Sequence, residues 1–259
     1  MSVDIASPTN ERIKWLVRLR DRRHRDAEGV FVVEGERLYT RALEAGRVPQ
    51  VTFVEPDLSL ETEGPTVTVA PAALDRASYR QRSQGVLAVF PQQDTGLTDL
   101  TPRGPDSLLV VAEGVEKPGN LGAMLRTAAA AGADALIAVG ATVDLHNPNV
   151  LRASTGAVFS MPSAVTTWDE LSPWLEKTGV RSVGAVPSAP NSMWDSDLTG
   201  AMALVLGAED SGLSERALAS LKDAVAIPQA PGAVDSLNVS VAAAILLFEA
   251  RRQRRHRLD

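Results

Sequence analysis

The stretch SLLVVAEGVEKPGNLGAMLRTAAAAGADALIAVG, residues 107–140, decides the fold class. It opens with an apolar run at 107–114 and closes with another at 135–140, each short enough to be typical of a buried strand. Between them, residues 120–133 are rich in alanine and leucine and end at a glycine, which predicts a helix. A strand, a helix and a second strand with short connections predict two parallel strands covered by a helix.

The same alternation continues on both sides of this stretch. Further strands are expected at 30–35, 51–56, 66–70, 85–90, 181–187, 201–209 and 224–229. Helices are expected at 11–23, 37–46, 71–78, 147–156, 168–179, 214–224 and 236–257. Residues 91–106 are rich in proline, glycine and aspartate, which favours a linker. We therefore predict an α/β protein made of a small domain at 1–93, a linker at 94–106 and a parallel-sheet domain at 107–259.

Composition excludes several classes of protein. The 259 residues are 44% hydrophobic and 22% charged, which is typical of a globular chain. They include no cysteine and only 3 histidines, so disulfides, thiolate metal sites and cysteine nucleophiles are excluded and no metal site is expected. The N-terminus lacks the apolar segment of a signal peptide, and the apolar run at 241–248 is far below the roughly 20 residues of a membrane span. A cytoplasmic protein without membrane contact is expected.

The net charge of −6 argues against a polyanionic partner only until the charges are placed along the chain. Residues 94–250 carry 8 basic and 18 acidic side chains, whereas 11–25 carry seven basic and two acidic ones and 251–259 carry five arginines and one aspartate. These two arginine-rich patches are either solvated helix faces or phosphate contacts. On the second interpretation, Arg22, Arg23 and Arg25 are candidate RNA-binding residues.

Three loops follow strands of the expected parallel sheet, where such sheets bind their ligands. They are EGVEKPGNLGAMLR (113–126), LGAEDSGLS (206–214) and IPQAPGAVDSLNVS (227–240). None has the glycine spacing of a dinucleotide-binding turn or the lysine of a P-loop. Each also has an ordinary interpretation: Asn120 and Ser236 as helix caps, Arg126 as a surface ion-pair residue, and Glu209 as a solvated charge at a strand end.

Taken together and in this order, the three loops resemble the motifs of the SpoU–TrmH family of RNA 2′-O-ribose methyltransferases, within the SPOUT superfamily. The segment NPNVLRASTGAVFSMP (147–162), which contains Arg152, resembles the part between the family's first two motifs. Residues 1–93 resemble more loosely the ribosomal-protein-like RNA-binding domain that precedes many catalytic domains of the family.

The resemblance implies a fold, a cofactor and an assembly. The parallel sheet would end in a C-terminal trefoil knot that binds S-adenosylmethionine, and the active site would form at the subunit interface of a homodimer. The residues that match the family's cofactor contacts are Val186, Pro187, Gly207, Ile227 and Leu237. Those that match the polar residues of its reaction centre are Asn120, Arg126, Glu209, Ser236 and Asn238. Arg152 joins the candidate RNA-binding residues.

The implied reaction is transfer of a methyl group to a ribose 2′-hydroxyl of structured RNA, with 23S ribosomal RNA as the first choice of substrate and tRNA as the second. The family's proposed base is the arginine that matches Arg126. The pKa of an arginine side chain lies far above neutral pH, so deprotonating one there costs about 8 kcal/mol. The alternative is a charged Arg126 that holds the phosphate beside the target ribose, with Glu209 orienting Arg126 or Asn120.

Two other functions compete with this interpretation. A non-catalytic RNA-binding protein on the same fold would be expected to lack a motif residue, yet all five polar positions are present. A nucleotide-dependent oxidoreductase would need a glycine-rich turn followed by an acidic residue about 20 positions on, and the two do not occur together here. The sequence also departs from the family's pattern twice. Lys117 stands where an acidic residue is usual, and APGAVD (230–235) is one residue longer than in many members.

Overall fold

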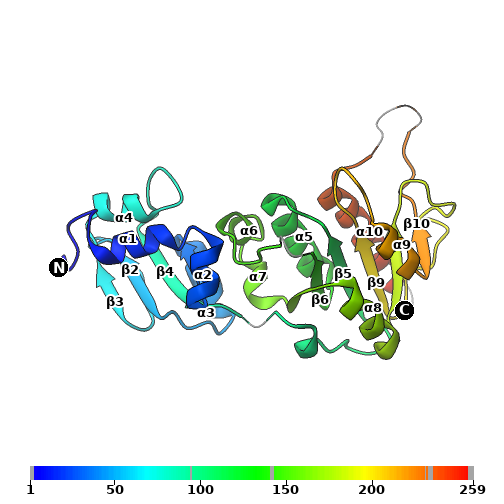
Figure 1. Ribbon diagram of the computed structural model, residues 1–259, viewed down its shortest axis with the longest axis horizontal. Helices are drawn as coiled ribbons and strands as arrows, with labels where there is room; N and C mark the ends of the chain where they lie inside the picture. The colour runs from blue at the N-terminus through cyan, green and yellow to red at the C-terminus, as the bar shows by residue number, and fades with distance from the viewer. Residues whose placement is uncertain (1–2, 94, 141–142, 231, 233–235, 256–259) are drawn as a thin grey trace. The chain divides into compact units, whose positions relative to one another are not determined.

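The computed structural model describes residues 3–93, 95–140, 143–230, 232 and 236–255 (Figure 1). The chain divides into two compact units, each with its own sheet. The first comprises Met1–Gln93 and Asp144–Ser160, and the second comprises Asp94–Val143 and Met161–Asp259.

The first unit is built on a four-stranded mixed sheet. Its strands are β1 (Val30–Glu34), β2 (Val51–Val54), β3 (Thr66–Thr68) and β4 (Val86–Pro91), in the order β1-β4-β2-β3. The central strand β4 is antiparallel to both β1 and β2, and only β2 and β3 are parallel. The strand positions agree with the sequence prediction, whereas the antiparallel pairing was not predicted.

The helices of the first unit cover this sheet. They are α1 (Glu11–Arg18), α2 (Arg22–Glu28), α3 (Glu36–Glu44), α4 (Pro71–Ala77), α6 (Pro148–Ala153) and α7 (Ala157–Ser160). The prediction of one helix over 11–23 is wrong. Asp21 is extended and its side chain accepts a hydrogen bond from the backbone N–H of Arg23 at 2.8 Å, so it caps a second helix and ends the continuity of the first.

Residues 144–160 pack with the first unit although they lie far along the chain. The rings of His146 and Phe159 stack on Phe31, with centroid distances of 4.8 and 6.1 Å. Arg47 donates to the carbonyl oxygen of Phe159 at 2.9 Å. The buried guanidinium of Arg25 forms an ion pair with Asp144. This segment therefore shares the core of the RNA-binding half proposed from the sequence.

The second unit contains the parallel sheet that the sequence predicts. Its strands are β5 (Leu108–Glu113), β6 (Ala135–Val139), β7 (Ser163–Thr166), β8 (Arg181–Ala185), β9 (Met202–Leu206) and β10 (Asp223–Val225), in the order β10-β8-β9-β5-β6-β7. Every pairing within this sheet is parallel, so the carboxyl ends of all its strands lie along one edge. Strand β7 was not predicted.

Helices cover the parallel sheet. They are the short 3₁₀ helix η1 (Leu97–Asp99), α5 (Pro118–Ala131), α8 (Trp168–Thr178), α9 (Glu215–Ser220) and α10 (Val239–Arg255). Helices α5 and α10 pack against each other (Figure 1), while α8 and α9 bury Leu171 and Ala217 with alternate residues of the sheet. Leu100, in the expected linker, is buried in the same core. No helix of the described part of the chain is long and apolar enough to cross a membrane.

The last helix begins later than expected. Its cap is Asn238, whose Oδ1 accepts from the backbone N–H groups of Ser240 and Val241 at 3.0 and 3.4 Å. The interpretation of Ser236 as the cap is therefore wrong, because that residue lies two positions before the cap. Part of the helix expected at 236–257 falls on 256–257, outside the described residues.

Candidate active site

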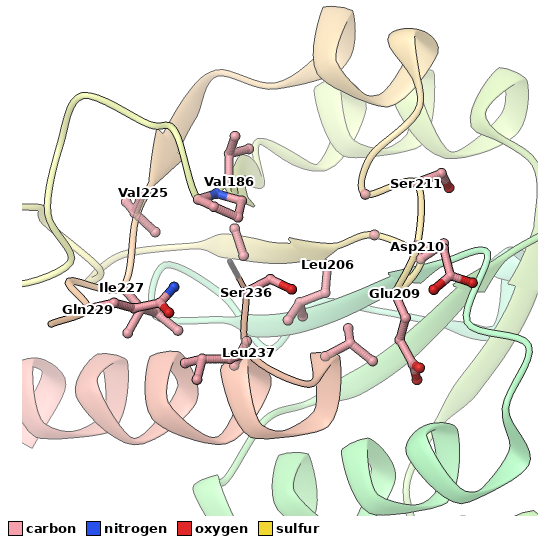
Figure 2. Close-up of a pocket in the computed structure, with 17 residues that line it drawn as sticks. Val186, Leu206, Glu209, Asp210, Ser211, Val225, Ile227, Gln229, Ser236 and Leu237 are labelled. Atoms are coloured by element: carbon pink, nitrogen blue, oxygen red, sulfur yellow. The ribbon is translucent and has the colours of Figure 1, made fainter. Parts of the chain in front are cut away.

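A cavity of about 330 Å³ lies at the carboxyl ends of the parallel strands (Figure 2). The loops that follow β8, β9 and β10 line it. The five predicted cofactor-binding residues all lie on its wall, namely Val186, Pro187, Gly207, Ile227 and Leu237. Glu209 and Ser236, predicted for the reaction centre, line it as well. The structure thus brings seven predicted site residues from three loops into one cavity.

The loop after β9 is a tight turn that only glycine permits. The backbone N–H of Ala208 donates to the carbonyl of Gly212, and the N–H of Gly212 donates to the carbonyl of Ala208, both at 3.0 Å. A Cβ atom on Gly207 would lie 2.2 Å from the carbonyl carbon of Gly212. The close approach of two backbone segments therefore requires glycine at 207 and fixes how Glu209 is presented to the cavity.

Glu113, at the end of β5, anchors this loop. Its Oε1 accepts hydrogen bonds from the Ser214 hydroxyl at 2.6 Å and the Trp168 indole N–H at 2.5 Å, and its Oε2 accepts from the Ser214 backbone N–H at 3.0 Å. Ser214 also caps α9. Sequence reasoning missed Glu113, although it is the first charge after a buried strand, the same signal that marked Glu209.

Two predicted reaction-centre residues meet beside the cavity. The amide Nδ2 of Asn238 donates to Oδ1 of Asn120 at 3.2 Å, across 118 positions of sequence. Asn120 lies in the first turn of α5, and the Oδ1 of Asn238 is already held by the first turn of α10. This bond connects the first and third sequence motifs.

The carboxylate of Glu209 pairs with Lys117 rather than with Arg126 or Asn120. The hydrogen bond from Lys117 to Glu209 raises the pKa of the lysine. The side chain of Arg126 is exposed on α5 and has no hydrogen-bond or ion-pair partner among the residues that the structure describes. The expectation that Glu209 orients Arg126 or Asn120 is therefore not met in this structure. Lys117, which stands where an acidic residue is usual in the family, is the partner of Glu209 instead.

The cavity suits a ligand with an apolar body and several N–H or O–H groups. Leu206, Ile227 and Leu237 are among the apolar residues that line it. Oε1 of Glu209 and Oε1 of Gln229 are buried acceptors that lack a partner within the described ranges, and Figure 2 shows them at opposite ends of the cavity. Sequence reasoning did not single out Gln229. The longer segment 230–235 falls largely on 231 and 233–235, outside the described residues.

The predicted RNA-binding arginines differ in accessibility. Arg25 is 1% exposed, donates to the carbonyls of Leu19 and Arg20 at 3.0 and 2.7 Å, and pairs with Asp144. The prediction that Arg25 contacts RNA is therefore wrong, because protein groups surround its guanidinium.

The other basic candidates keep some exposed surface. Arg22 pairs with Asp26 at 3.2 Å and is 43% exposed, and Arg23 is exposed. Arg152 is half-buried and bonds to Asn149. In the C-terminal patch, burial lowers the pKa of Arg254, which donates to the carbonyl of Gly200 at 2.6 Å. At least part of the basic tail is thus structural.

Comparisons with known proteins agree with this architecture. The model of the SpoU rRNA Methylase family matches residues 107–248, and that of the MRM3-like substrate binding domain matches 10–88. An uncharacterized tRNA/rRNA methyltransferase of Synechocystis is 32% identical over 98% of this chain and 96% of its own. The 23S rRNA (guanosine-2′-O-)-methyltransferase RlmB of Escherichia coli K12 is 36% identical over 76% of this chain and 83% of its own.

A solved structure extends the likeness to the whole fold. The rRNA methyltransferase of Sinorhizobium meliloti with bound S-adenosylmethionine superposes with a TM-score of 0.88 at 31% identity, covering 96% of this chain and 97% of its own. Fold, cavity and relatives define the class as RNA 2′-O-methyltransferases. The chain belongs to the SpoU rRNA methylase family, whose model matches more than half of it.

Proposed function

We propose that this protein transfers the methyl group of S-adenosylmethionine to the 2′-hydroxyl of a ribose in 23S ribosomal RNA. The observation that carries the proposal is the hydrogen bond between Asn120 and Asn238, beside a cavity lined by Glu209 and Ser236. The bond joins the first and third motifs, and Glu209 belongs to the second. Polar residues of all three motifs therefore lie at one edge of the sheet. The choice of ribosomal RNA is supported by the RlmB relatives and by the match to a substrate binding domain.

S-adenosylmethionine is the cofactor and supplies an electrophilic methyl group on a sulfonium. The residues present fit it. Ile227 and Leu237 would contact its apolar parts, and the free oxygens of Glu209 and Gln229 would accept its N–H or O–H hydrogens. Val186, Pro187 and Gly207 complete the proposed binding site.

The protein's own task is to position the ribose and stabilise charge. A carbon–oxygen bond to the ribose would form as the methyl carbon–sulfur bond breaks, with that bond's electron pair kept by sulfur, and the proton of the 2′-hydroxyl would pass to solvent water. Asn120 and Asn238 orient that hydroxyl, and Ser236 is a further polar group on the cavity wall. The unpaired guanidinium of Arg126 holds the adjacent phosphate and stabilises the negative charge that develops on the oxygen.

Assembly and location are also part of the proposal. Residues 1–93 bind RNA, and 144–160 pack with them. Residues 94–106 connect, and the rest of 107–259 forms the catalytic domain with a C-terminal trefoil knot, acting as a homodimer in the cytoplasm. The homodimer is supported by an exposed apolar face of α10, where Val241 and Phe248 are 46% and 49% exposed on either side of Ile245. The knot is supported by family membership, and an experimental trace through 226–238 tests it.

Substitution of Arg126 tests the mechanism. Arg126→Ala is expected to reduce methyl transfer by at least a hundredfold, because the phosphate contact and the charge stabilisation are both lost, while calorimetry shows cofactor affinity within twofold of wild type. Arg126→Lys keeps the charge and is expected to retain partial activity. Arg103→Ala, which removes an exposed arginine paired with Asp134, is the control. An equal loss of cofactor affinity in Arg126→Ala would contradict the assigned role.

Mapping of ribose methylation tests the substrate. Total RNA from cells with and without the protein is compared at every position, and purified 23S rRNA and tRNA are offered separately to the purified protein. A new 2′-O-methyl group in 23S rRNA is expected. Methylation of tRNA alone would replace the substrate, and methylation of neither RNA would refute the function.

A further inference from the structure

The loop between α4 and β4, residues 78–85 and hereafter the α4–β4 loop, is the most basic feature of the first unit that the sequence analysis left unassigned. Arg80 and Arg82 lie on it and are exposed, and exposed Arg76 precedes it on α4. None of the three forms an ion pair within the described ranges, whereas Lys14, Arg22 and Arg41 of the same unit are each paired with a carboxylate.

A buried carboxylate fixes the start of this loop. Glu34, at the end of β1, is 8% exposed. Its Oε1 accepts from the Ser78 hydroxyl at 2.5 Å, and its Oε2 accepts from the backbone N–H of Tyr79 at 3.0 Å. The Ser78 hydroxyl in turn accepts from the N–H of Arg80 at 2.9 Å. Burial of a carboxylate is costly, and here both of its oxygens are used to hold loop atoms.

A second carboxylate fixes the end of the loop. Asp75 accepts from the backbone N–H of Ser83 at 2.6 Å, and the Ser83 hydroxyl accepts from the N–H of Gly85 at 2.9 Å. Glu34 and Asp75 are thus bonded to loop backbone and hydroxyl groups. The loop is ordered by acidic side chains that leave the guanidinium groups of Arg80 and Arg82 without an internal anion.

The loop borders a shallow hollow with a cationic wall. Arg20, Arg76, Tyr79 and Arg80 are among its lining residues, and its volume is about 580 Å³. The guanidinium of Arg20 lies 5.6 Å from the centroid of the Tyr79 ring and donates to the carbonyl of Arg76 at 2.8 Å. The exposed guanidinium groups of Arg76 and Arg80 at this hollow have the planar, two-donor form that binds phosphate oxygens in a bidentate way.

We propose that the α4–β4 loop is an RNA-backbone contact site, in which Arg80 and Arg82 bind phosphates of the substrate and Glu34 is a positioning residue that holds the loop for them. The proposal rests on the proposed function, since it names where that RNA is held. Each phosphate contact releases condensed counterions, so the site makes a defined contribution to the salt dependence of RNA binding.

The first experiment removes the two charges. Binding of a full-length 23S rRNA transcript is measured over a series of salt concentrations for wild type, for Arg80→Ala/Arg82→Ala and for Arg41→Ala/Arg216→Ala. The loop variant is expected to bind about 10- to 100-fold more weakly, with the slope of log affinity against log salt smaller by about 1.5. The control loses the same charge from paired, exposed positions outside the basic patches and is expected to bind within threefold of wild type.

The second experiment keeps both arginines and loosens the loop. Glu34→Gln removes a negative charge, so a purely electrostatic effect would strengthen RNA binding. Loss of positioning is expected to weaken it at least threefold instead. Ser78→Ala breaks the same contact from the other side and is expected to weaken binding without any change of charge. Thermal unfolding and cofactor affinity near wild type verify that both variants are folded.

The outcomes separate this inference from the function. Suppose that the wild-type protein methylates the transcript while Arg80→Ala/Arg82→Ala and Glu34→Gln bind it with wild-type affinity and salt slope. That result overturns the loop site and leaves the function intact. Tighter binding by Glu34→Gln overturns the positioning role. A wild-type protein that neither binds nor methylates the transcript overturns the function and the loop site together.

Discussion

At the scale of single residues, the pairing of Lys117 with Glu209 distinguishes this chain. The Lys117 side chain is 68% exposed and that of Glu209 only 20%, so the lysine covers a carboxylate at the cavity mouth. An uncovered carboxylate would repel the RNA phosphates that Arg126 is proposed to hold. The departure from the acidic residue usual at position 117 therefore has an electrostatic consequence.

Lys117→Met is expected to lower kcat/KM for RNA by roughly twofold to fivefold, in the range of an exposed ion pair, with cofactor affinity unchanged. Methyl transfer to 23S rRNA at several salt concentrations measures it. In a Glu209→Gln background the same change is expected to have no further effect on RNA affinity. Additive losses would show instead that Lys117 contacts RNA directly.

His146 predicts a pH dependence of stability. Burial lowers the pKa of His146 to about 4, helped by the positive charge of Arg25. The folded state therefore keeps it neutral, whereas the unfolded state binds a proton below about 6.5. The free energy of unfolding is expected to fall by up to about 1.4 kcal/mol per pH unit from 6.5 toward 4.

Denaturant titrations at several pH values between 7 and 5.5 measure this effect. This interval is chosen because it lies above the pH range in which most carboxylates titrate. His146→Phe keeps an aromatic ring against Phe31 and is expected to flatten the dependence, while His24→Gln is expected to retain it. A pH dependence unchanged in His146→Phe would assign it to other groups.

At the scale of elements, the turn after β9 depends on the absence of one side chain. Gly207→Ala would push a Cβ into the backbone of Gly212, and neither segment can move without breaking the paired hydrogen bonds of the turn. We expect cofactor affinity to fall at least tenfold and the protein to lose about 1–3 kcal/mol of stability. Calorimetry and thermal unfolding measure both.

Gly119→Ala is the matched control for this substitution. Gly119 lies in the first turn of α5 with nothing within 4 Å of its would-be Cβ, so alanine there is expected to be neutral or slightly stabilising. Equal effects at both glycines would mean that the turn does not require glycine at 207.

Elements were predictable where local pattern decides them. The apolar runs around 107–140 predict β5, α5 and β6 to within two residues at each end, and short connections predict their parallel pairing. The family resemblance predicted one site for Gly207, Ile227 and the strand end at Val186, and all three residues line one cavity. The sequence could not indicate that β4 runs antiparallel to its neighbours, because pairing direction depends on distant segments.

The errors in the candidate site share one physical cause, namely partners far away in sequence. Arg25 looked like an RNA contact within a basic run, but its guanidinium is buried and its partner Asp144 is 119 positions away. Glu209 looked free to orient Arg126, but Lys117 reaches it across 92 positions. Charge patterning along a chain does not reveal such pairs.

At the scale of the whole molecule, the exposed apolar face of α10 predicts the oligomeric state. Phe248→Glu puts a charge into the proposed interface and is expected to convert a dimer into a monomer, with loss of methyl transfer. Light scattering after size exclusion measures the mass. Trp194→Glu, at an exposed tryptophan outside α10, is the control and is expected to remain dimeric. A monomeric wild type, or a dimeric Phe248→Glu, would contradict the proposed interface.

The return of residues 144–160 to the first unit bears on how such proteins exchange parts during evolution. A single crossover can exchange a structural unit between relatives only if that unit is continuous in the chain. The first unit is not continuous, because it also contains 144–160. A recombinant joined at residue 93 would inherit Phe31 and Arg25 from one parent and their partners Phe159 and Asp144 from the other. Substrate-recognition halves of this architecture can therefore be exchanged only together with a short insert taken from within the catalytic sequence.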